Sequence, residues 1–72
     1  MKSEEMKRAA RLLDHRVRVS CTDGTGFTGV WVDWISGQDN EPDPESILLE
    51  MPQAGLMEVF VEDIVSIEEE KA

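Results

Sequence analysis

The hydrophobic pattern at the start of the chain has the period of an α-helix. Residues 3–14 read SEEMKRAARLLD, and four of them follow the spacing i, i+3, i+4, i+7. This spacing aligns apolar side chains along one side of a helix. The sequence therefore predicts an amphipathic helix over residues 3–14 that buries one apolar stripe. The stripe consists of Met6, Ala9, Ala10 and Leu13.

From Arg16 onward the hydrophobic period changes to two. Val17, Val19 and Cys21 alternate with polar residues, as in a strand with one buried face. Asp23-Gly24 is typical of a tight turn, and Pro52 begins another turn segment. Four further strands are predicted between turn residues. They cover residues 27–35, 46–51, 57–62 and 64–68.

The predicted strand 27–35 is apolar on both faces, which is unusual in so short a chain. Such a strand must change sides partway, and Gly29 is predicted to allow a bend and the close passage of another strand. Trp31 and Trp34 lie in this strand. They could stack on nucleic-acid bases, but a place in the core or in a subunit contact is favoured.

The length of the chain limits its stability as a monomer. A domain of 72 residues buries only about 60% of the surface that its unfolded chain exposes. Cys21 is the single cysteine, so neither an internal disulfide nor a cysteine-rich zinc site can supplement the core. Oligomerisation is the favoured supplement. Short strands separated by turns predict a closed or nearly closed small barrel of about five strands.

The residues of the first predicted hairpin resemble a known family. The run VRVSCTDGTGFTGVWVDW, with a turn at Asp23-Gly24, looks like the first motif of Sm-like (LSm) proteins, and VFVEDIVSIE looks like the closing strands of their second motif. The segment DNEPDPESI also resembles short Sm-like proteins of bacteria and their phages. The resemblance implies a mainly β fold: one Sm-like domain over residues 1–72, with an N-terminal helix (3–14), a five-stranded, strongly bent small barrel (16–68) and a tail (69–72).

The resemblance also implies assembly into a ring through edge strands, which hides edges and adds buried area. Sm-like RNA-binding proteins hold a base with an Asp and an Asn that follow the second strand. The corresponding positions here are Ile35 and Asp39, and the acidic pair Glu62-Asp63 replaces a basic or polar pair of the closing motif. Uridine binding in the usual pore pocket is therefore not expected, because added carboxylates repel phosphate.

Charge is distributed unevenly along the chain. The net charge is −9, yet the first 18 residues hold six bases against three acids, a net of +3. The remainder holds one base, Lys71, against thirteen acids, a net of −12. Any nucleic acid would have to contact the N-terminal segment. The candidate nucleic-acid-binding residues are Lys7, Arg8, Arg11, Arg16 and Arg18.

Three features resemble reactive or metal sites without fitting them. Carboxylates alternate from Asp39 to Glu45, but Pro44 stands where a calcium loop of the EF-hand type needs Gly. His15 has no partner ligand near it in sequence, and Cys21 has no neighbouring base that would make it a nucleophile. We therefore predict no metal, no cofactor and no catalytic residues.

Two functional hypotheses from different classes follow. The leading one is a non-enzymatic Sm-like protein that forms a homo-oligomeric ring and serves as an interaction module. The alternative is an Sm-like protein that binds RNA through its basic helix face. A cytoplasmic location is expected, since the N-terminus has no apolar run typical of a signal peptide or spanning helix. The predicted subunit interface comprises Met57, Val59, Phe60, Val61, Ile64 and Ile67.

Overall fold

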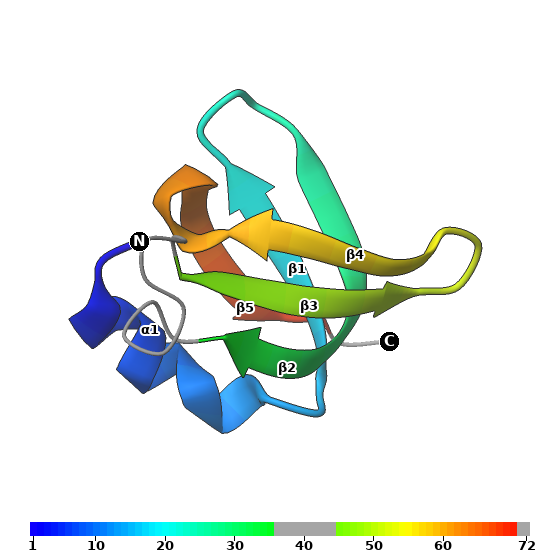
Figure 1. The fold of residues 1–72 in the computed structure, drawn as a ribbon, viewed down its shortest axis with the longest axis horizontal. Coiled ribbons are helices and arrows are strands. Elements are labelled where there is room, and N and C mark those ends of the chain that lie inside the picture. Colours follow the sequence, from blue (N-terminus) through cyan, green and yellow to red (C-terminus); the bar gives the residue numbers. More distant parts are fainter. Residues whose placement is uncertain (36–44, 71–72) are drawn as a thin grey trace.

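A computed structural model describes residues 1–35 and 45–70 (Figure 1). A short helix precedes five antiparallel strands, so the prediction of a mainly β fold with an N-terminal helix is confirmed. The elements in chain order are α1 (Ser3–Ala9), the 3₁₀ turn η1 (Ala10–Leu12), β1 (Arg16–Cys21), β2 (Gly26–Ile35), β3 (Ser46–Met51), β4 (Gly55–Phe60), the 3₁₀ turn η2 (Val61–Asp63) and β5 (Ile64–Glu69).

The N-terminal helix is shorter than predicted, and its apolar stripe ends differently. After Ala9 the chain tightens into η1, where residues three apart share a face. Leu12 therefore follows Ala9 into the core, whereas Leu13 is exposed. Asp14 adopts a positive φ of 71°, and its N–H donates to the carbonyl of Trp31 at 2.7 Å. This bond directs the chain from the helix into β1.

The strands form an open sheet rather than a closed barrel, which corrects the prediction for residues 16–68. The strand order is β4-β3-β2-β1-β5, so β4 and β5 are the two edges of the sheet. Figure 1 shows that β2 curves strongly, which brings the two halves of the sheet to face each other. The turn η2 links the two edge strands, and within the described residues β4 and β5 do not pair with each other.

Strand β2 changes sides at a bulge at Val32. Trp31 pairs with Leu49 and Asp33 pairs with the next residue of β3, which leaves Val32 as the extra residue. Trp34 pairs with Ile47, so the two tryptophans lie on the same face of the sheet three residues apart. Trp31 is fully buried, which confirms its predicted place in the core. The strand was predicted to change sides at Gly29, but it does so three residues later, at Val32.

Gly29 instead permits the close approach that was also predicted for it. A Cβ atom at this position would lie 2.6 Å from the carbonyl oxygen of Glu50 on β3. Only a residue without a side chain fits there.

The hydrophobic core lies inside the curve of the sheet and is completed by α1 and η1. Its buried residues come from every described helix, turn and strand of the chain. The N-terminal amine of Met1 donates hydrogen bonds to the carbonyls of Val61 and Ile64, which attaches the start of the chain to η2. Cys21 packs against the core and is half-buried. The buried core consists of Met6, Ala9, Leu12, Val17, Val19, Trp31, Ile47, Leu49, Val59, Val61 and Ile64.

Candidate functional site

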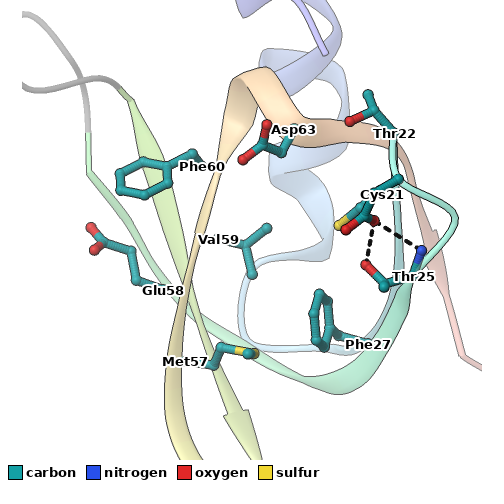
Figure 2. Close-up of a pocket in the computed structure, with 10 residues that line it drawn as sticks. Cys21, Thr22, Thr25, Phe27, Met57, Glu58, Val59, Phe60 and Asp63 are labelled. Carbon is teal, nitrogen blue, oxygen red and sulfur yellow. Dashed lines mark hydrogen bonds between the residues drawn. The ribbon is translucent and has the colours of Figure 1, made fainter.

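A groove of about 280 Å³ lies between the edge strand β4 and the turn that joins β1 to β2 (Figure 2). Phe27 and Met57 lie at one end of it, and η2 bounds the other end. The lining combines apolar residues with three acidic residues and contains no Lys, Arg or His. The lining residues are Cys21, Thr22, Asp23, Thr25, Phe27, Met57, Glu58, Val59, Phe60 and Asp63.

The turn between β1 and β2 fixes the first carboxylate of the groove. Asp23 Oδ1 accepts hydrogen bonds from the N–H of Thr25 at 3.0 Å and from its hydroxyl at 2.6 Å. Gly24 between them has a φ of 88°, which glycine adopts without strain. The hydrogen bonds from Thr25 lower the pKa of Asp23. The carboxylate of Asp23 is therefore ionised and oriented at neutral pH.

The opposite wall of the groove belongs to β4 and η2. Met57 and Val59 alternate with Glu58 and Phe60 along β4. Figure 2 shows the side chains of Met57 and Val59 on the side of β4 that faces Phe27, and those of Glu58 and Phe60 on the other side. Ser46 on β3 donates its hydroxyl to Glu58 Oε2 at 2.8 Å, which holds the Glu58 carboxylate.

The second carboxylate of the groove, that of Asp63, comes from η2. The backbone carbonyl of Asp63 accepts a hydrogen bond from the N–H of Thr22 at 2.9 Å, and this bond joins η2 to the end of β1. The groove can therefore receive a group with an apolar stem and a cationic end.

Cys21 contributes a free thiol to the same groove. A reactive thiolate needs a nearby base or cation, and none of the lining residues is Lys, Arg or His.

The six residues of the predicted subunit interface differ in exposure. Val59, Val61 and Ile64 are at most 6% exposed and belong to the core of the single chain, so their side chains are not available to a neighbouring subunit. Val61 is the first residue of η2 and Ile64 follows its end, so the three-residue period of η2 directs both inward. Met57 and Ile67 are half-buried, and Phe60 is 36% exposed.

Two exposed apolar residues of the sheet edges were missed. Leu56 on β4 is 64% exposed, and Val65 on β5 is 58% exposed. Each lies directly beside a residue of the predicted subunit interface, Met57 or Ile64. The strict alternation of a strand was the signal that could have identified them.

The five candidate nucleic-acid-binding residues are all exposed, but they come from two parts of the fold. Three belong to α1 and η1, and two belong to the outer face of β1. Arg18 lies opposite Glu68 in the pairing of β1 with β5, which places an acid beside it. Nearby, His15 Nδ1 lies 3.5 Å from Glu69 Oε2. Lys7, Arg8 and Arg11 form the helix group, and Arg16 and Arg18 form the strand group.

The positions that correspond to the base-binding pocket of Sm-like proteins are only partly described. Ile35 ends β2, while Asp39 lies outside the described residues. Glu62 and Asp63 are both exposed on η2. Most of the acidic run from Asp39 to Glu45 also lies outside the described residues.

Glu45 is the one member of that run within the described part of the chain. It accepts a hydrogen bond from Trp34 Nε1 and is half-buried. Among residues 1–35 and 45–70, no group of three or more His, Cys, Asp or Glu residues is placed to hold a metal ion. Within the same ranges, no helix has the length and apolar character needed to cross a bilayer. Comparison of the chain with protein-family models, curated proteins and solved structures found no match.

Proposed function

We propose that this chain is a non-enzymatic, Sm-like interaction module that assembles with copies of itself into a ring. In this assembly β4 of one subunit pairs with β5 of the next. The observation that carries the proposal is the open sheet, whose two edges are β4 and β5. Both edges carry exposed apolar side chains, namely Leu56 and Phe60 on β4 and Val65 on β5. A sheet edge with exposed apolar residues favours association with another strand.

The gain from burying these three side chains supports association but does not suffice alone. Complete burial of a large apolar side chain contributes about 1.5–3 kcal/mol, and Leu56, Phe60 and Val65 are 64%, 36% and 58% exposed. Together they contribute on the order of 3–4 kcal/mol per contact. Association costs at least about 4 kcal/mol in lost freedom of motion. Backbone pairing along the edges and closure of a ring must therefore provide the remainder.

Light scattering on wild-type protein and two matched variants tests the proposal. Phe60 on β4 and Leu13 at the end of the helix are both 36% exposed, so Leu13→Asp is a control for Phe60→Asp. We expect a multimer for the wild type and for Leu13→Asp at micromolar concentrations, and smaller species for Phe60→Asp. A wild-type monomer, or equal loss of assembly in both variants, would contradict assembly through the β4 edge.

RNA binding through the basic residues is the second candidate function. The observation in its favour is that all five candidate residues are exposed. In a ring, each subunit would present the same helix face, and symmetry would multiply a modest patch. The acidic remainder of the chain opposes this function, because phosphate is repelled by carboxylates. The basic residues concerned are Lys7, Arg8, Arg11, Arg16 and Arg18.

A further inference from the structure

The groove beside β4 has the features of a site for an extended polypeptide. Within the described residues β4 pairs only with β3, so alternate backbone groups on its outer edge face the groove side without a strand partner. An added strand can pair with such an edge and place its side chains in adjoining pockets. The apolar residues Phe27 and Met57 provide a surface for one of those side chains.

The volume of the groove suits a single long side chain. Pockets for drug-sized ligands measure about 300–1,000 Å³, and this groove measures about 280 Å³. The groove is bounded by β4 on one side and by the turn that contains Asp23 on the other. A side chain entering from an added strand would thus contact both walls.

The negative charge of the lining favours a positively charged side chain in the groove. The carboxylates of Asp23 and Asp63 border the groove, and the lining includes no basic residue. Arginine suits this arrangement because its planar guanidinium donates to more than one carboxylate while its stem packs on apolar surface. The ring of Phe27 offers an additional favourable contact for a cation.

We propose that this groove binds an extended, arginine-bearing segment of a partner protein, which pairs with the edge of β4 and places its guanidinium between Asp23 and Asp63. This names the partner class of the interaction module and rests on that proposed function. A second copy of the chain matches the same edge less well in charge, because its β5 carries Glu68 and Glu69. An edge holds one strand at a time, so the bound segment competes with self-assembly.

Fluorescence anisotropy with a labelled peptide, Thr-Val-Arg-Val-Thr, tests the site. The control peptide replaces arginine with citrulline, which keeps the shape and removes the charge. We expect saturable binding of the arginine peptide and an affinity about tenfold lower for the citrulline peptide, because charged hydrogen bonds are the stronger ones. Equal affinities, or no binding of the arginine peptide at millimolar concentration, would overturn the proposal.

Two charge-matched variants show whether the binding occurs in the groove. Asp63→Asn removes a carboxylate of the lining, and Glu4→Gln removes an exposed carboxylate on α1 that does not line it. We expect about tenfold weaker binding for Asp63→Asn and a change of less than about twofold for Glu4→Gln. Equal effects of the two variants would mean general attraction to an acidic protein and would overturn the site.

Light scattering on the same samples separates this proposal from self-assembly. A multimer that does not bind the arginine peptide would refute the groove alone. A monomer that binds it would refute self-assembly alone. When both proposals hold, the arginine peptide is expected to shift the multimer toward smaller species, whereas the citrulline peptide is not.

Discussion

Replacement of Gly29 by Ala is the sharpest test of how this sheet is packed. The new Cβ would lie 2.6 Å from the carbonyl oxygen of Glu50 and 3.1 Å from Cγ of Met51. The flexible methionine can move, but the carbonyl belongs to a strand that pairs with β2 on one side and β4 on the other. The strands must therefore separate locally, and overpacking of this kind costs about 1–3 kcal/mol.

The net loss of stability is the cost of overpacking minus the gain from a lower entropy of the unfolded chain. Ala restricts the unfolded chain and returns about 0.4–1 kcal/mol, which leaves a loss on the order of 1–2 kcal/mol. A chain of this length has a free energy of unfolding of about 4–11 kcal/mol. The expected decrease in Tm is about 4–16 °C, since 1 kcal/mol corresponds to about 4–8 °C in so small a domain.

Urea unfolding followed by tryptophan fluorescence measures the effect, at one fixed protein concentration because assembly contributes to apparent stability. Gly26→Ala is the matched control in the same strand. A Cβ at Gly26 would have its nearest contact, the carbonyl oxygen of Val19, at an ordinary 3.6 Å. We expect Gly26→Ala to be neutral or slightly stabilising. If the two variants are equally stable, the close crossing of β2 and β3 at Gly29 is refuted.

Two further predictions concern charge. Hydrogen bonds from Thr25 lower the pKa of Asp23, so their contribution to stability is present above the unfolded pKa and disappears as the pH falls through the lower, folded pKa. The difference in Tm between wild type and Asp23→Ala should therefore be constant from neutrality to about pH 5 and shrink in stronger acid; a difference that grows in acid contradicts the assignment. In titrations of labelled single-stranded RNA at low and physiological salt we expect weak binding, because the chain beyond Arg18 carries a net −12. Sub-micromolar affinity with a steep salt dependence that is lost on substituting alanine for Lys7, Arg8 and Arg11 would instead establish the nucleic-acid function.

The periodicity of the sequence was sufficient to predict the order and type of the elements, because strand and helix patterns depend on local alternation. The prediction for Leu13 failed where the chain forms the 3₁₀ turn η1. A 3₁₀ turn changes the period to three over only three residues, which is too short for a hydrophobic pattern to reveal.

The open edges of the sheet could not be predicted for a different reason. Whether β4 and β5 pair with each other depends on the total curvature of the sheet, and the bulge at Val32 contributes to that curvature. Nothing in the alternation of apolar and polar residues specifies a bulge, since both faces of residues 27–35 are apolar. The groove lies beside the edge of β4 that is unpaired within the described part of the chain. The sequence therefore could not predict that the residues lining it come together in one site.

The turn η2 connects the two proposals physically. It joins the edge strands β4 and β5, and the carbonyl of Asp63 within it accepts the hydrogen bond from Thr22 that holds η2 against β1. The carboxylate of the same residue lines the groove. The backbone of Asp63 therefore maintains the spacing between the edges, while its side chain sets the charge that an added strand meets. Asp63→Asn preserves the first role and alters the second, so a loss of arginine binding without loss of fold assigns the effect to the groove.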